Sequence, residues 1–136
     1  MAGVKSRRKV TPARWEELKA QAQAVVDKTI AKLPPDVLAE AQKVPVLFHE
    51  FCEEDPEILG IYGHFEPGEV SPANGPIILY LVTIDDYCAD EGEDFADEVR
   101  LTYLHELGHH LGWDEGDLEA RGLGYSRAYR RGRPLV

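Results

Sequence analysis

Residues 100–115 read RLTYLHELGHHLGWDE and contain the pattern H-E-x-x-H, with His105, Glu106 and His109 at its fixed positions. On a helix of 3.6 residues per turn, four positions advance by about 400°, so the two histidines lie about 40° apart. Both imidazoles can therefore reach one metal ion, while Glu106 lies on the flank of the same face. The spacing predicts a zinc-binding helix on which Glu106 acts as general base toward a metal-activated water.

A catalytic zinc site also needs a third protein ligand, with one position left open. Gly112 can end the helix in a left-handed cap, and that cap would turn the chain back toward the ion. Carboxylates follow at once in the sequence. The spacing H-E-x-x-H-x-x-G-x-x-ligand places its glycine at Gly112 and its third ligand at Glu115. We therefore rank Glu115 first as metal ligand, Asp114 second and Asp117 third.

The residues around the motif predict an amphipathic helix that starts near Phe95. One broad arc of this helix is apolar and comprises Leu101, Tyr103, Leu104, Leu107, Gly108 and Leu111. The opposite arc is polar and comprises Thr102, His105, Glu106 and His109. Acidic residues stand at the predicted start, where the helix dipole favours negative charge, namely Asp94, Asp97 and Glu98.

The motif resembles that of the minimal zincin-like metallopeptidases, small bacterial proteins of about this length. The resemblance is clearest in HELGHHLG at 105–112 and continues through DEGDLEARG at 114–122. It extends to DPEILGIY at 55–62 and GPIILY at 75–80, which look like strands of that family. The family commonly has an aspartate as third ligand, whereas this chain has Glu115 at that spacing. The methionine turn of true metzincins is absent, because the only methionine is Met1.

This resemblance implies a zincin-like α+β fold and the activity of a zinc metallopeptidase, with one zinc ion and a peptide or protein substrate. We expect a long N-terminal helix, a mixed sheet of three or four strands, and a second long helix that carries the metal. In such folds, a strand near the metal helix aligns the substrate backbone by strand addition.

The rest of the chain supplies the expected elements in order. Thr11 and Pro12 suit a helix start, and the double proline at 34–35 ends that helix. The remaining pattern predicts a short helix at 36–42, strands at 44–49, 58–65 and 77–84, a loop at 67–76 and a helical turn or two at 118–123. His49 is expected to be an exposed strand residue, with a metal or substrate role as the alternative. Tyr125 is expected to pack in the structure, with hydrogen bonding to a developing oxyanion as the alternative.

Length and charge bound the remaining possibilities. The 136 residues predict a flexible basic N-terminus at 1–10, a single zincin-like domain at 11–125 and a flexible basic tail at 126–136. A net charge of −10 argues against nucleic acid or an anionic membrane as partner. The chain has two cysteines, no secretory signal pattern and no apolar stretch of spanning length, so we expect a cytoplasmic protein.

Two alternatives to a peptidase stay open at this level, and so does the oligomeric state. The first alternative is a zinc-binding, non-catalytic module that interacts with a peptide or protein; a closed, four-ligand site would favour it. The second is a metal-free interaction protein whose acidic surface serves a basic partner. Two nitrogens and one carboxylate also accept iron, cobalt or manganese, so the pattern does not single out zinc.

Overall fold

The computed structural model describes residues 9–63 and 75–123. Most of the predicted basic N-terminus, the end of the predicted second strand and most of the predicted loop therefore lie outside the described residues. Tyr125 and the predicted tail at 126–136 lie outside them as well. No helix within the described ranges is both long enough and apolar enough to cross a membrane.

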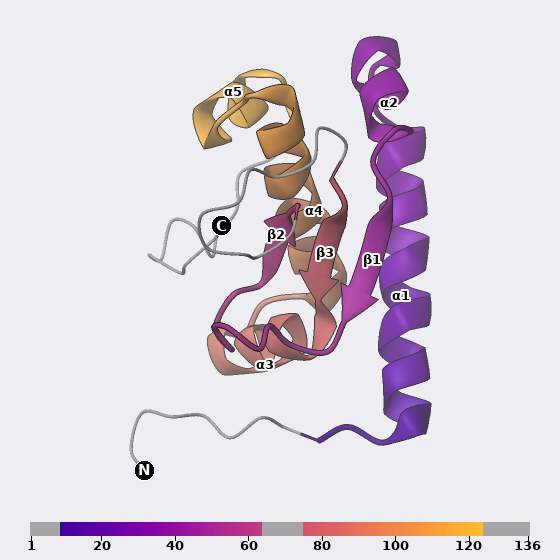
Figure 1. The fold of residues 1–136 in the computed structure, drawn as a ribbon, viewed down its shortest axis with the longest axis vertical. Helices are drawn as coiled ribbons and strands as arrows, with labels where there is room; N and C mark the ends of the chain where they lie inside the picture. Colours follow the sequence, from indigo (N-terminus) through magenta and orange to yellow (C-terminus); the bar gives the residue numbers. More distant parts are fainter. Residues whose placement is uncertain (1–8, 64–74, 124–136) are drawn as a thin grey trace.

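The chain folds into helices packed on a small mixed sheet, as expected for an α+β zincin-like protein (Figure 1). In order, the elements are α1 (Pro12–Ala31), α2 (Pro35–Ala41), β1 (Val46–His49), β2 (Gly60–Tyr62), β3 (Ile77–Tyr80), α3 (Leu81–Glu91), α4 (Phe95–Leu111) and α5 (Glu115–Ala120). The described strands form one sheet in the order β1-β3-β2. β1 is parallel to the central strand β3, and β2 is antiparallel to it.

The long N-terminal helix begins where the sequence predicts. The Thr11 side chain accepts a hydrogen bond from the backbone N–H of Arg14 at 3.1 Å, and Pro12 occupies the first helical position. This cap satisfies one of the backbone donors that a helix start leaves unpaired. The buried side of α1 faces the core with Leu18, Ala22, Val26 and Thr29. Helix α1 contacts α4 and α3 (Figure 1).

The central strand β3 is buried along its whole length and divides two apolar clusters. Side chains alternate between the faces of a strand. Ile77 and Leu79 belong to the main core, together with α1, α3 and α4. Ile78 and Tyr80 belong to a smaller cluster with Cys52, Ile58 and Ile61. The sheet is therefore covered on both faces, and this explains why its central strand carries no polar alternation.

The predicted strand at 77–84 is wrong beyond Tyr80. Leu81 begins α3, which continues to Glu91 and ends at Gly92 in a left-handed conformation with φ of 69°. Residues 81–84 are buried in the helix, as they would also be in a central strand. An apolar run of this length does not distinguish the two structures by periodicity. Of the predicted second strand, the described residues 58–63 form a ladder only at 60–62.

Helix α4 has the predicted ends, and its predicted polar arc is largely buried. The Asp94 side chain caps its start by accepting from the N–H of Asp97 at 2.9 Å. Only Ala96 and His109 among its residues are exposed, whereas Thr102 and Glu106 are buried. The polar arc is covered because β2 lies directly on it: a Cβ added to Gly60 would come within 2.9 Å of Thr102 Cγ2. A glycine at position 60 permits this close approach.

Candidate metal centre

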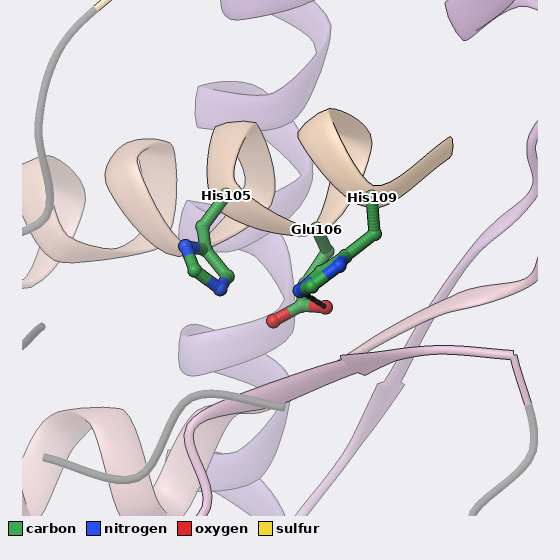
Figure 2. Close-up of side chains that lie close together, drawn as sticks. All are labelled: His105, Glu106 and His109. Carbon is green, nitrogen blue, oxygen red and sulfur yellow. Dashed lines mark ion pairs between the residues drawn. The ribbon is translucent and has the colours of Figure 1, made fainter. Parts of the chain in front are cut away.

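Helix α4 brings the side chains of His105, Glu106 and His109 together on one side (Figure 2). Each offers one ligand atom, and these three atoms all lie within 4.8 Å of one another. The two imidazole rings meet edge to face, with centroids 4.9 Å apart. His109 Nε2 lies 4.0 Å from Glu106 Oε1. The helical spacing thus produces a group of nitrogen and oxygen donors that could hold a metal ion.

Glu106 is the deepest member of this group, with 0% of its surface exposed. Neither of its carboxylate oxygens has a hydrogen-bond partner among the described residues. Burial raises the pKa of the Glu106 carboxyl well above its ordinary range, and the negative charge of Glu115 adds to that shift. A buried carboxyl without a partner costs free energy, and a nearby cation would offset that cost. The donor set and its burial therefore fit a divalent metal.

Glu115 is the first residue of α5, and its side chain reaches the candidate metal centre. Its Oε1 lies 2.5 Å from Nδ1 of His105, and both side chains are largely buried. A carboxylate that hydrogen-bonds one ring nitrogen of a histidine orients the other nitrogen toward a metal. Glu115 is not in the three-residue group of mutually close ligand atoms. In this structure it contacts the candidate ligand His105 and adds negative charge beside Glu106.

Asp114 and Asp117, the other two candidates for the third ligand, cap the start of α5. Asp114 Oδ1 accepts from the N–H of Asp117 at 2.8 Å, and Asp117 Oδ2 accepts from the N–H of Asp114 at 3.0 Å. This reciprocal capping box starts α5, and both side chains are exposed. Among the three sequence candidates, Glu115 is the one that is buried and touches His105.

Two other histidines of the chain lie in contrasting positions. His49 is exposed on β1, as expected, with its ring 6.2 Å from that of Tyr80. The sequence pattern predicts no role for His110, which follows the candidate ligand His109. Its ring is nearly buried and contacts Tyr62 and Glu40. The doubled histidine was visible in the sequence, but these partners are 48 and 70 residues away along the chain.

Comparison with known families agrees with this geometry. A sequence model of the zincin-like metallopeptidase family matches residues 35–125, from α2 past the end of α5. The chain belongs to this family. The matched region contains the whole sheet and the helix with the His–Glu–His group, so the family relation covers the candidate centre. Membership in the zincin-like metallopeptidase family implies zinc as the metal. A comparison with curated proteins gave no match.

Proposed function

We propose that this protein is a zinc-dependent peptidase that hydrolyses peptide bonds, with Glu106 as general base. One observation supports this proposal most directly: a fully buried carboxyl without a hydrogen-bond partner in the described part of the chain lies between two histidines on one helix. Buried polar groups of this kind mark sites where a ligand or chemistry completes the environment.

His105 and His109 would hold the zinc ion through ring nitrogens, and Glu115 is the proposed third protein ligand. Two imidazoles and one carboxylate are a donor set that catalytic zinc sites use. Glu115 is proposed from its spacing after the motif and from its burial. Its carboxylate lies at the rim of the group, where in this structure it bonds the ring of His105. When bound, zinc supplies positive charge that polarises the scissile carbonyl and makes water a better nucleophile.

Glu106 would move the proton during hydrolysis. In its ionised form, the carboxylate accepts a proton from the attacking water, and it then donates that proton to the departing amine. Both oxygens are available for this task, because neither hydrogen-bonds to a described residue. Complete burial keeps bulk water from competing for the same carboxylate.

Strand β2 is the proposed guide for the substrate. It is an edge of the sheet: β3 pairs with it on one side, and no described strand pairs with it on the other. It also contacts α4, the helix that carries the candidate ligands. An extended peptide that added itself to β2 would align its backbone beside those ligands. We therefore propose an unfolded or extended peptide segment as the substrate class.

The variant Glu106→Gln tests the role of the general base. Glutamine keeps the shape of the side chain but does not accept the proton, so we expect zinc binding to persist while turnover falls by about 10²–10⁴-fold. Zinc content is measured by elemental analysis of protein without an affinity tag, and cleavage by mass spectrometry of a peptide mixture. Glu16→Gln, on the exposed side of α1, is the matched control and should cleave at the parental rate.

The outcomes separate the alternatives. Cleavage by Glu106→Gln at the parental rate would show that the general-base assignment is wrong. Zinc binding by the parental protein, with no cleavage of any peptide, would favour the non-catalytic zinc module. If the parental protein contains no zinc and added zinc does not raise its melting temperature, the remaining alternative is a metal-free interaction protein.

A further inference from the structure

The side chain of His110 points away from the candidate metal group and into the fold. Consecutive residues on a helix lie about 100° apart, so the two neighbouring histidines face different surroundings. The side chain of His109 is 45% exposed, whereas that of His110 is only 6% exposed. His110 Nδ1 lies 2.8 Å from the hydroxyl of Tyr62, and its Nε2 lies 3.0 Å from Glu40 Oε1. The last turn of α4 is thereby bridged to β2 on one side and to α2 on the other.

Glu40 sets the direction of its hydrogen bond to His110. Lys43 Nζ lies 2.8 Å from the second carboxylate oxygen of Glu40. Lys43, and after it His110, lowers the pKa of Glu40, so that this carboxylate acts only as an acceptor. Nε2–H of His110 then donates to Glu40, while Nδ1 shares a hydrogen bond with the Tyr62 hydroxyl. The ring is thus held at both nitrogens, and it also meets the Tyr62 ring edge to face at 5.6 Å.

We infer that His110 is a positioning residue for the metal centre: it clamps the turn of α4 that carries His109 between β2 and α2. The inference rests on the proposed function, because it assigns a task to His110 only if His109 binds zinc. Helix ends fray, and the clamp adds to the glycine cap and to the packing of Gly108 against Leu118 that also hold this end. The clamp also joins the proposed substrate strand to the metal-bearing turn, since Tyr62 is the last residue of β2.

Two variants remove the clamp without changing the buried ring of His110. Tyr62→Phe removes one hydroxyl and keeps the aromatic contact, and Glu40→Ala removes the acceptor from a helix position that suits alanine. Each should weaken zinc binding about tenfold, the lower end of the effect of residues that support metal ligands. The dissociation constant is measured with Zn²⁺ alone, by competition between metal-stripped protein and a chromophoric chelator.

Asp85→Ala is the matched control. It also deletes a carboxylate that joins two helices, since Asp85 Oδ1 lies 3.2 Å from Arg14 of α1. This pair lies outside the last turn of α4, so the variant should keep the parental zinc affinity even if its melting temperature falls. If Tyr62→Phe and Glu40→Ala both keep the parental zinc affinity and only their melting temperatures fall, the inference is overturned. The hydrogen bonds of His110 would then be ordinary structural contacts. Parental protein that binds no zinc would overturn the proposed function as well, so the two failures are distinguishable.

Discussion

At the scale of single residues, three carboxylates within four positions of one another have different tasks. Asp114 and Asp117 hydrogen-bond each other's backbone N–H groups and start α5. Glu115, between them, is buried and hydrogen-bonds the ring of His105. An oxygen that already accepts a backbone hydrogen bond at an exposed helix start is poorly placed to serve a buried metal centre. The geometry therefore supports Glu115 as the carboxylate that acts on the centre.

Exchange of each carboxylate for its amide tests this assignment. Glu115→Gln removes the charge but keeps an oxygen able to accept from His105, and we expect the zinc dissociation constant to rise about 10–100-fold. Asp114→Asn and Asp117→Asn should keep the parental zinc affinity, and replacement of a capping side chain costs at most about 0.5–2 kcal/mol of stability. Chelator competition measures the affinity, and urea unfolding the stability. A loss of zinc affinity in Asp117→Asn but not in Glu115→Gln would move the third ligand to position 117.

At the scale of the element, a glycine cap sets the C-terminal end of α4. Gly112 adopts φ of 73° and ends the helix, and its backbone N–H reaches the carbonyls of Gly108 and His109. The N–H of Trp113 also reaches the Gly108 carbonyl, at 2.8 Å. These bonds satisfy carbonyls that a helix end leaves without partners. They end the helix one residue after the two neighbouring histidines and turn the chain toward Glu115.

Substitution of Gly112 tests the cap, because a side chain at this position affects only the backbone conformation. A Cβ added at this position meets no described atom within 4 Å, so steric conflict with neighbours does not contribute. Gly112→Ala should destabilise the metal-stripped protein by about 1–2 kcal/mol, because a residue with Cβ is disfavoured in the left-handed region. Gly112→Asn should cost less, since asparagine tolerates that region. Urea unfolding measures both, and equal stability of the alanine variant and the parental protein would contradict the cap.

At the scale of the whole molecule, the core keeps reactive groups away from solvent. Cys88 on α3 packs in the main core, and Cys52 packs in the smaller cluster on the other face of the sheet. Burial raises the pKa of the Cys88 thiol to about 12, and the negative charge of Glu98 adds to this effect. The thiolate is the reactive form of cysteine. Cys88 should therefore react only when the molecule opens.

Alkylation measures this protection. At pH 8, iodoacetamide should modify native Cys88 about a thousandfold more slowly than the same residue in urea, because the pKa is raised from 9.0 to about 12. The raised pKa also makes the free energy of unfolding depend on pH. The folded state holds the thiol proton more tightly than the unfolded state, so the stability that comes from this proton is present below pH 9 and is lost as pH rises toward 12. Mass spectrometry of the labelled peptides gives the rates. Native labelling as fast as labelling in urea would show that the core around α3 is open.

The sequence by itself determined the features that depend on neighbours within a few residues. Thr11 as a cap, acidic residues at the start of α4, Gly112 as its end, and the convergence of His105 and His109 all follow from local backbone geometry. The strand starting at Ile77 and the α+β class were also predictable, because apolar patterning and turn residues act over short segments.

Only the tertiary structure decided what depends on residues far apart in the chain. It ended β3 at Tyr80, since burial of the next four residues suits a helix as well as a strand. It covered Thr102 with β2 and buried Glu106, and it brought Glu115, one of three nearby acids, to His105. It also joined His110 to two distant elements. The physical reason is common to all four: burial and side-chain contacts are set by packing between elements, which local periodicity does not encode.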